Sequence, residues 1–225
     1  MPKRFVIGDI HGCSKTLKAL VENKLQPAKN DTLYFLGDYI DRGPDSKGVI
    51  DYLFWLKDSG YTIHTLMGNH EHFLLRSKVD NALFRSWKRN GGGNKALQSF
   101  CITHPNNLEE KYLYFFENLK THIVLDDAVL VHAGIHCNKE NFFNDFVTLL
   151  YTRETIYDAE KLGNRKVIHG HTPVPLAHIH EQLNTQSPVI DLDSGCVYFK
   201  REGLGNLSAL ELNSWQLFTQ KNIED

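Results

Sequence analysis

The sequence has only four cysteines among its 225 residues, and no two of them form a C-x-x-C pair. Neither a zinc site built from cysteine pairs nor a dithiol redox motif is indicated, and we expect reduced thiols in a cytoplasmic protein. The chain also lacks any run of about 18 apolar residues, the length that a membrane-spanning helix needs. The apolar run Phe5–Ile7 is too short for a signal peptide and is ended by Gly8 and Asp9. These absences predict a protein without membrane contact.

An excess of charge of one sign is also missing. The 25 lysines and arginines nearly balance the 27 aspartates and glutamates, which leaves a formal net charge of -2. A chain this close to neutral does not create the positive field that draws proteins to nucleic acid, so we expect no nucleic-acid partner. The length fits one domain with a well-buried core, and no internal repeat or low-complexity stretch divides it. We therefore expect a single domain over residues 1–225.

The first third of the chain alternates between short apolar runs and segments with helical periodicity. The apolar runs predict strands over Lys3–Ile7, Thr32–Leu36 and Tyr61–Met67. Between these strands, helices are predicted to begin at the capping residues Ser14 and Ser46. This alternation is typical of parallel βαβ units, whose ligand sites form in the loops after the carboxyl ends of the strands.

The rest of the chain predicts a mixed pattern. Residues 78–121 are predicted to be mostly helical with a break at Asn90–Gly93, and a hairpin is predicted around residues 126–127. A helix over residues 141–151 and a strand over Val167–His169 follow. The last part is predicted to form four strands, over Ala177–His180, Pro188–Leu192, Val197–Phe199 and Leu207–Leu212. The tail Gln220–Asp225 is predicted to be frayed.

Polar side chains that can ligate metals stand in the loops just after predicted strands. Six of them belong to Asp9, His11, Asp38, Asn69, His132 and His171. All six offer nitrogen or oxygen donors, which suit Mn, Fe or Zn. A lone Asp or His in a loop is more often a turn or surface residue, but five such loops in one chain favour a shared site. Two metals there could make hydroxide from water and offset the charge of a phosphate ester, and Asp38 could bridge them through its two oxygens.

Five short segments carry these residues: GDIHG (Gly8–Gly12), GDYIDRG (Gly37–Gly43), GNHE (Gly68–Glu71), VHAG (Val131–Gly134) and HGHTP (His169–Pro173). Together, and in this order, they resemble the phosphoprotein phosphatase family of metallophosphoesterases. The resemblance implies an α/β (α+β) fold, a β-sandwich of two mixed sheets flanked by helices, with a dinuclear metal site at the strand-end loops. That fold agrees with a chain that begins as βαβ units and ends in strands.

The resemblance also implies roles for residues at matching positions. One metal would be held by Asp9, His11 and Asp38, and the other by Asp38, Asn69, His132 and His171. Two divalent ions are implied, with Mn²⁺ expected first and Fe or Zn as alternatives. His70 matches the family's general acid, and Asp41 matches the carboxylate that pairs with it. His169 is expected to lie behind the ligand His171.

Three further residues are expected to bind the phosphate. Arg42 matches a phosphate clamp of the family, and its planar guanidinium suits two phosphoryl oxygens. Arg153, within LLYTRE, matches a second clamp of bacterial and phage members. Asn90 stands with Trp87 in a W-x-x-N-G-G segment and is expected either to help bind the phosphate or to end a helix. This segment and residues 193–198 (DSGCVY) resemble the bacterial and phage serine/threonine phosphatases.

These observations leave three functions to compare. The first is a protein serine/threonine phosphatase that acts on phosphorylated protein or peptide, with a metal-bridging hydroxide as nucleophile and His70 as general acid. The alternative is a symmetrical dinucleoside polyphosphate hydrolase that cleaves diadenosine tetraphosphate, since that branch shares the metal motifs. Residues 77–120, the expected wall over the site, should distinguish the two. A scaffold protein without catalysis is the remote third reading, and the intact His70, Asp41 and Arg42 oppose it.

Overall fold

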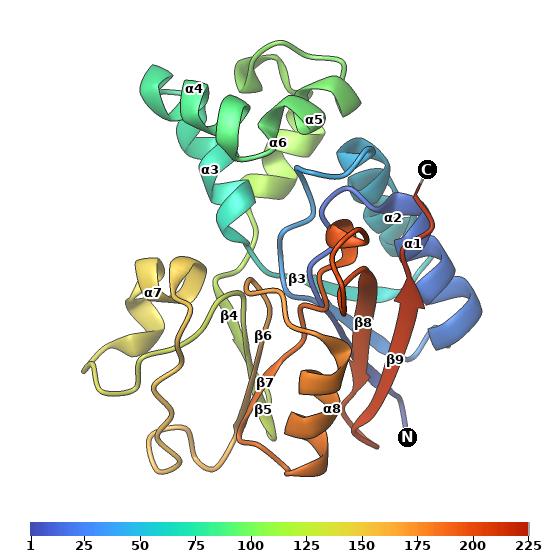
Figure 1. The fold of residues 1–225 in the computed structure, drawn as a ribbon, viewed down its shortest axis with the longest axis vertical. Coiled ribbons are helices and arrows are strands. Elements are labelled where there is room, and N and C mark those ends of the chain that lie inside the picture. The colour runs from blue at the N-terminus through green and yellow to red at the C-terminus, as the bar shows by residue number, and fades with distance from the viewer. Residues whose placement is uncertain (225) are drawn as a thin grey trace.

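The computed structural model describes residues 1–224 as two packed β-sheets with helices around them (Figure 1). The first sheet has the order β3-β2-β1-β8-β9, formed by β1 (Arg4–Ile7), β2 (Thr32–Phe35), β3 (Thr62–Thr65), β8 (Asn206–Glu211) and β9 (Gln216–Lys221). The second has the order β4-β5-β6-β7, formed by β4 (His122–Val124), β5 (Ala128–Val131), β6 (Lys166–His169) and β7 (Val189–Asp191). Each sheet contains parallel and antiparallel pairs. The predicted sandwich of two mixed sheets is confirmed.

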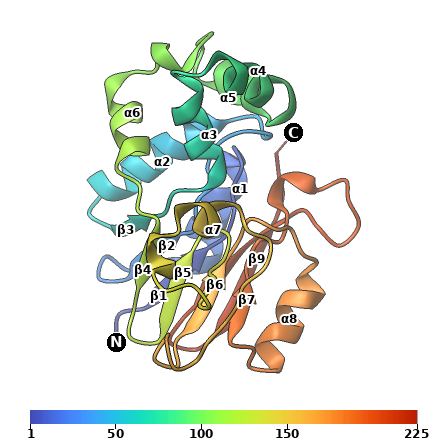
Figure 2. The same cartoon turned by 90° about the vertical axis from the view of Figure 1, so that its left-hand side faces the viewer.

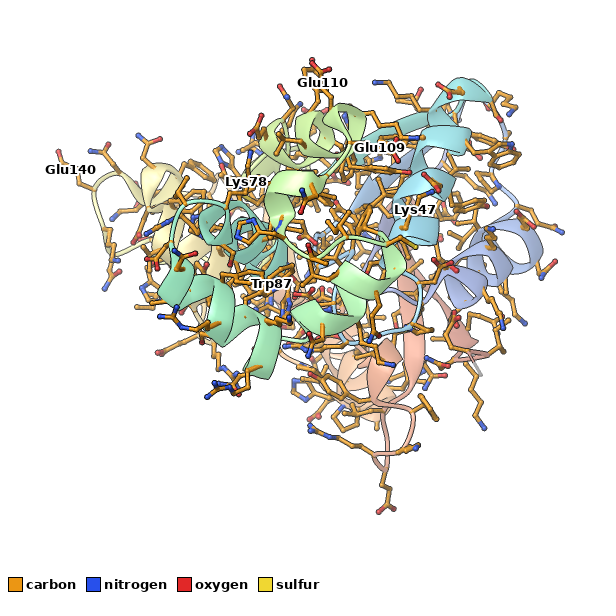
Figure 3. All side chains as sticks on the ribbon, turned by 90° about the horizontal axis from the view of Figure 1, so that it is seen from above. Lys47, Lys78, Trp87, Glu109, Glu110 and Glu140 are labelled. Carbon is orange, nitrogen blue, oxygen red and sulfur yellow. The ribbon has the colours of Figure 1, made fainter. Side chains whose placement is uncertain are left out.

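Helices cover the outer faces of the sheets, one side of the apolar layer between them, and one of their ends. Beside the first sheet lie α1 (Ser14–Ala19), the π-helical turn η1 (Leu20–Leu25) and α2 (Ser46–Asp58). The second sheet is flanked by α7 (Phe146–Tyr151), after the turn η3 (Phe142–Asn144), and by α8 (Leu176–Asn184). A further layer lies above both sheets in Figures 1 and 2, and consists of α3 (Asn69–Ser77), α4 (Asn81–Asn90), α5 (Gly93–Ser99), the turn η2 (Pro105–Asn107) and α6 (Glu110–Glu117). Figure 3 views this layer from above and shows Trp87 within it.

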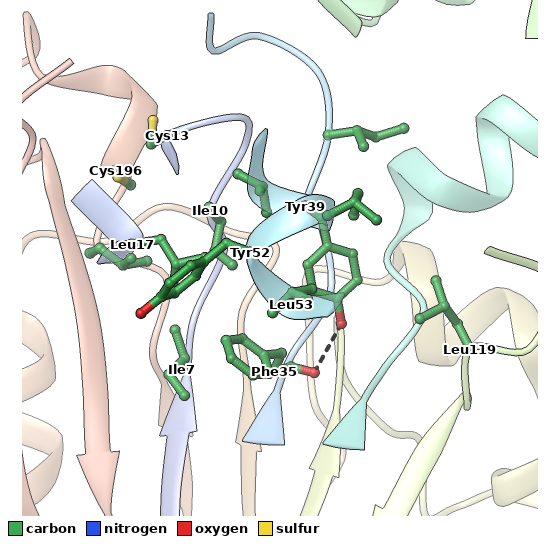
Figure 4. Packing of buried hydrophobic residues seen from close by; sticks show 14 of the residues in the cluster. Ile7, Ile10, Cys13, Leu17, Phe35, Tyr39, Tyr52, Leu53, Leu119 and Cys196 are labelled. Carbon is green, nitrogen blue, oxygen red and sulfur yellow. Dashed lines mark hydrogen bonds between the residues drawn. The ribbon is translucent and has the colours of Figure 1, made fainter. Parts of the chain in front are cut away.

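Successive residues of the strands face different apolar layers. In β1, Phe5 and Ile7 pack toward the α1 and α2 side, whereas Val6 packs between the two sheets with Leu130 and Ile168. Figure 4 shows the helix side of this arrangement, where the Tyr39 hydroxyl donates to the carbonyl of Phe35 (3.4 Å). Because both faces of the central strands are buried, these strands are apolar throughout and their polar residues are confined to the loops at their ends.

The late part of the chain differs from the prediction. The predicted strand Ala177–His180 is wrong, because these residues lie within helix α8. Leu176, Ile179 and Leu183 recur at helical spacing and pack into the layer between the sheets, a pattern that outweighs the β-like composition of the segment. The predicted strand Val197–Phe199 is also wrong, since the 3-10 turn η4 covers Cys196–Tyr198.

Two further expectations are corrected at segment ends. The tail is ordered up to Glu224: β9 runs to Lys221, and the amide of Asn222 donates to the carbonyl of Gly205 (2.8 Å), whereas Asp225 lies outside the described residues. The predicted caps Ser14 and Ser46 are instead the first residues of their helices. The cap of α2 is Asp45, whose carboxylate accepts from the amide of Gly48 and from the hydroxyl of Ser14.

Several other predictions are confirmed. The helical region 78–121 breaks at Asn90–Gly93, where α4 ends and α5 begins, and the hairpin around residues 126–127 joins the antiparallel strands β4 and β5. Among residues 1–224, no helix has the length and apolar character needed to cross a bilayer.

Candidate metal centre and active site

The loops that follow five strands meet at the end of the sheets covered by the α3–α6 layer. They carry Asp9 and His11 after β1, Asp38 after β2, Asn69 after β3, His132 after β5 and His171 after β6. Although they are polar, Asp9, His11, Asp38 and His132 are each at most 3% exposed. The structure thus brings the six predicted ligands together, with Asn69 and His171 half-buried. Parallel strands put their carboxyl ends at the same edge of a sheet, and the packing of the two sheets brings the two edges together.

A first group of side chains combines the predicted ligands His11 and Asp38 with the predicted general acid His70, whose nitrogen and oxygen atoms lie within 4.8 Å of one another. Nδ1 of His11 donates to the carbonyl of Ile40 (2.9 Å), which leaves a lone pair on Nε2. This Nε2 lies 3.4 Å from Oδ2 of Asp38. Burial, reinforced by the charge of Arg42, lowers the pKa of His11 well below its ordinary value. The imidazole is therefore neutral, as a metal ligand must be.

A second group consists of Asp38, His132 and His171, again within 4.8 Å. Nδ1 of His132 donates to the carbonyl of Leu36 (3.0 Å), so its Nε2 also carries a lone pair. That Nε2 lies 3.1 Å from Oδ1 of Asn69 and 3.4 Å from Oδ1 of Asp38. Atoms that can only accept repel one another at such distances, and a cation among them removes the conflict. Asp38 belongs to both groups and turns one oxygen toward each, the arrangement expected of a bridging ligand.

Asp9 completes the donor set. Its Oδ2 accepts from the backbone amide of His171 (2.9 Å), whereas its buried Oδ1 has no hydrogen-bond partner within residues 1–224. A Cβ at Gly170 would lie 2.1 Å from this Oδ1, so only glycine leaves room for it. Burial, together with the carboxylates of Asp193 and Asp38, raises the pKa of Asp9 well above its ordinary value. A buried carboxylate oxygen without a partner, among like charges, fits a ligand for a divalent cation.

The backbone of the site is strained in a consistent way. Within residues 1–224, ten residues other than glycine have positive φ, and half of them belong to the site, with φ of 48° at His11, 51° at Asp38, 72° at Asp41, 63° at Arg42 and 72° at His171. Each such conformation costs on the order of 1–3 kcal/mol and persists only where the surrounding structure enforces it. The rest of the fold therefore holds these loops in the conformations that direct their side chains to one point.

His70 is held by a short chain of hydrogen bonds. Its Nδ1 donates to Oδ2 of Asp41 (2.6 Å), and the same oxygen accepts from the indole nitrogen of Trp87 (2.6 Å). This leaves Nε2 on the side of the ring that faces Asp38, 3.9 Å from its Oδ2. Burial alone would lower the pKa of His70, but Asp38 and Asp41 outweigh it and raise the pKa above its ordinary value. A protonated, oriented imidazole can deliver a proton at Nε2.

Two of the three predicted phosphate contacts, Arg42 and Asn90, line a cavity of about 230 Å³. It is lined by Arg42, Asn69, His70, Phe73, Trp87 and Asn90, among others. The guanidinium of Arg42 contacts Nε2 of His11. Gly92 has a φ of 89°, and a Cβ there would lie 2.7 Å from the amide of Arg42, so the N-G-G segment lets the α4–α5 corner approach that residue. Asn90 is the last residue of α4, directly before the C-cap Gly91, and it lines the cavity.

Arg153 lies on the other side of the centre, two residues beyond α7, and is exposed. Burial lowers the pKa of His171 to about 3, and the charge of Arg153 acts in the same direction, which places this charge near the second group. His169 is half-buried, with Nδ1 donating to the carbonyl of Gly170 (3.0 Å). It contributes to neither group of ligand atoms, as expected.

Comparison with known proteins identifies the family, because the family model of the calcineurin-like phosphoesterases matches residues 3–207. The chain belongs to the calcineurin-like phosphoesterase family. A curated relative, the bis(5'-nucleosyl)-tetraphosphatase PrpE (asymmetrical) of Geobacillus thermodenitrificans, is 30% identical over 220 residues, which cover 86% of this chain and 85% of that protein. Members of the family use a dinuclear divalent metal site, and candidate ligands for one are present in this phosphoesterase.

Solved structures agree with the fold of this phosphoesterase. A crystal structure of a candidate diadenosine tetraphosphatase has a TM-score of 0.65 at 22% identity, over 99% of this chain and 96% of that one. A protein serine/threonine phosphatase from Saccharomyces cerevisiae has a TM-score of 0.67 at 16% identity, over 100% of this chain and 81% of that one. At these identities the likeness establishes the fold alone.

Glu71 of this phosphoesterase is a residue to which the sequence analysis gave no role. It is fully buried, and its Oε2 accepts from the amides of Asp38 and Gly68 (both 3.0 Å). Its Oε1 accepts from the amides of Tyr39 (2.8 Å) and Ile40 (3.3 Å). One carboxylate thus ties the loop after β2 to the start of α3. Its position in the sequence could have indicated this role, because an acidic residue three places after the N-cap of a helix often accepts hydrogen bonds from backbone amides.

We expect Glu71→Gln to lower the free energy of unfolding by about 2 to 4 kcal/mol. The amide group of glutamine would replace one acceptor oxygen, so two backbone N–H groups would face a donor. Denaturant unfolding in excess chelator measures this cost without a contribution from metal binding. Glu140→Gln, at the exposed rim in Figure 3, is the matched control and should change stability by less than about 0.5 kcal/mol. Equal unfolding midpoints for the two variants would contradict the role given to Glu71.

Proposed function

We propose that this phosphoesterase is a metal-dependent hydrolase of dinucleoside polyphosphates, with diadenosine tetraphosphate as the representative substrate. The observation that carries the hydrolase is the convergence of six residues with nitrogen or oxygen donors, Asp38 among them, beside the His70–Asp41 pair. The substrate class is supported by similarity along most of the chain to a bis(5'-nucleosyl)-tetraphosphatase. The protein serine/threonine phosphatase expected first from the sequence has the weaker support, because the likeness to such a phosphatase is one of fold.

In this proposal the ligands keep the division expected from the sequence. Asp9, His11 and Asp38 would hold one divalent ion, and Asp38, Asn69, His132 and His171 the other. When bound, the pair of ions activates water and offsets the charge on the phosphoryl group. Mn²⁺ is the ion that we propose, since nitrogen and carboxylate donors without thiolate suit it.

The remaining side chains act on the substrate directly. His70 would donate the proton at Nε2 to the oxygen of the departing group, while Asp41 holds the opposite ring nitrogen and Trp87 holds Asp41. Arg42 and Arg153 would bind phosphoryl oxygens from two sides of the centre, and positive charge there stabilises the charge that builds up on these oxygens. Asn90 would add a neutral donor at the rim of the cavity.

The decisive experiment compares two substrates with one enzyme batch. We expect kcat/KM for diadenosine tetraphosphate to exceed that for a phosphoserine peptide by a factor on the order of 10². The expected products are ATP and AMP, because the relative similar along most of the chain is an asymmetrical enzyme. Asp38→Asn, which removes the shared ligand, serves as the control for contaminating hydrolases. A preference for the phosphopeptide would contradict the proposal and favour the protein phosphatase, and two molecules of ADP would indicate symmetrical cleavage.

A further inference from the structure

The turn that joins β7 to β8 forms a compact loop beside the metal centre. The amide of Gly205 donates to the carbonyl of Gly195 (3.0 Å) and closes its base. Inside the loop, the amide of Tyr198 donates to Gly195 (2.8 Å) and that of Arg201 to Tyr198 (2.8 Å). Figure 2 shows the loop projecting from the end of the sheets at which the α3–α6 layer lies. These bonds hold the backbone of the turn in one conformation.

One aromatic ring in this loop contacts two guanidinium groups. The Cζ atom of Arg42 lies 5.6 Å from the centroid of the Tyr198 ring, and that of Arg201 lies 4.5 Å from the same centroid. Such contacts stabilise a cation on the ring and limit where it can move. The two distances place the guanidinium carbons at most about 10 Å apart. Arg42, which contacts the ligand His11, and Arg201, on the turn, therefore both contact the Tyr198 ring, which puts a second positive charge near the one at the metal centre.

The guanidinium of Arg201 is available to bind a ligand. Arg201 is exposed, and its guanidinium makes no hydrogen bond or ion pair with any other residue of the described chain. Glu202 lies next to it on the turn but does not pair with it. The five N–H donors of Arg201 are thus open to a ligand, although the ring of Tyr198 restricts the position of the group.

We propose that Arg201, positioned by Tyr198, binds the phosphates of the departing nucleoside triphosphate, while Arg42 binds the phosphoryl group under attack. A polyphosphate chain carries negative charge along its length, and a planar guanidinium can bind two of its oxygens at once. A simple phosphomonoester at the metal centre has no charge that extends to Arg201. The residue therefore favours polyphosphates over monoesters, and this inference rests on the proposed function for the identity of the natural ligand.

Inhibition constants test the site without relying on cleavage of a dinucleotide. Hydrolysis of p-nitrophenyl phosphate is measured at fixed free Mn²⁺ with orthophosphate, tripolyphosphate or ATP as inhibitor. In Arg201→Gln, the inhibition constants of tripolyphosphate and ATP should rise about tenfold, the loss of one charge-assisted contact. The constant for orthophosphate and the kcat/KM for p-nitrophenyl phosphate should stay within about twofold of the wild type.

Three variants separate this site from general effects. Lys24→Gln removes one exposed positive charge at the end of η1, and should leave all three inhibition constants unchanged. Tyr198→Phe keeps the ring and should behave like the wild type, whereas Arg201→Lys keeps the charge without the fork and should recover only part of the affinity. Unchanged inhibition by ATP and tripolyphosphate in Arg201→Gln would overturn the inference, as would an equal rise for orthophosphate.

The two proposals fail in different ways. If the wild type does not cleave diadenosine tetraphosphate but Arg201→Gln still loses ATP and tripolyphosphate selectively, the proposed function is wrong and the polyphosphate site stands. If the wild type cleaves the dinucleotide and Arg201→Gln binds ATP normally, the function stands and the site is wrong.

Discussion

Replacing His70 with asparagine is expected to lower the turnover of phenyl phosphate by a factor of about 10² to 10⁴, the contribution usual for a general acid. The amide of asparagine is far too weak an acid to transfer a proton, so the oxygen of the departing group must leave as an anion. The fold around the residue should persist, because the helix amide of His70 rather than its ring donates to Asp38 (3.1 Å). The metal content of the variant should therefore equal that of the wild type.

The choice of substrate makes this prediction specific. A nitrophenolate departs without a proton more easily than a phenolate, so His70→Asn should slow p-nitrophenyl phosphate hydrolysis much less than phenyl phosphate hydrolysis. His180→Asn, an exposed histidine on α8, is the matched control and should retain wild-type rates on both substrates. An equal loss on the two substrates would show that His70 acts by binding or by holding the loop, and wild-type rates would remove it from the mechanism.

The candidate ligands could be predicted from the sequence because their positions depend on local rules. Short apolar runs such as Phe5–Ile7 identify strands, and the polar residues directly after them must lie at a sheet edge. Parallel pairing of β1 with β2 then brings the loops after them together, so the amide of His11 donates to the carbonyl of Asp38 (2.8 Å). Neither step requires knowledge of side-chain packing.

The contacts that orient the site could not be predicted in this way. The indole of Trp87 reaches Asp41 only because the α4–α5 corner folds back at Gly92 and Gly93. Helix α8 was mistaken for a strand because Ala177–His180 is short, and its apolar spacing becomes evident only when Leu183 is included. Such features depend on how separate segments pack, and a local pattern carries no information on them.

The substrate class also depends on how separate segments of the chain pack together. Loops that ligate the metals would be similar for a phosphoprotein and for a dinucleotide, because both reactions attack phosphorus at the same centre. What differs is the surface beyond that centre, and here Tyr198 and Arg201 form a charged extension suited to a polyphosphate. Residues 193–198 resemble a segment of bacterial and phage phosphatases, and the strand predicted over Val197–Phe199 gives no indication of the turn that carries these side chains.

Removal of metal is expected to lower hydrolysis of p-nitrophenyl phosphate by a factor on the order of 10³ or more, and added Mn²⁺ should restore it. The structural reason is the donor set itself. The lone pairs of His132 and Asn69 face each other at 3.1 Å, and the Oδ1 atom of Asp9 is buried without a partner. None of these atoms can activate water alone, whereas a divalent ion among them makes use of all of them.

The same donor set predicts an effect on stability that is independent of activity. One ion, at a free concentration 100 times its dissociation constant, stabilises the folded state by about 2.7 kcal/mol. This raises Tm by roughly 5 to 10 °C for a chain of this size. Asp38→Asn should lose most of this shift because Asp38 serves both groups, whereas loss of His171 should lower the stoichiometry from two ions to one. Full activity in excess EDTA, with metal content near zero, would contradict the metal centre. A Tm that Mn²⁺ raises equally in the wild type and in Asp38→Asn would place the ions elsewhere on the protein.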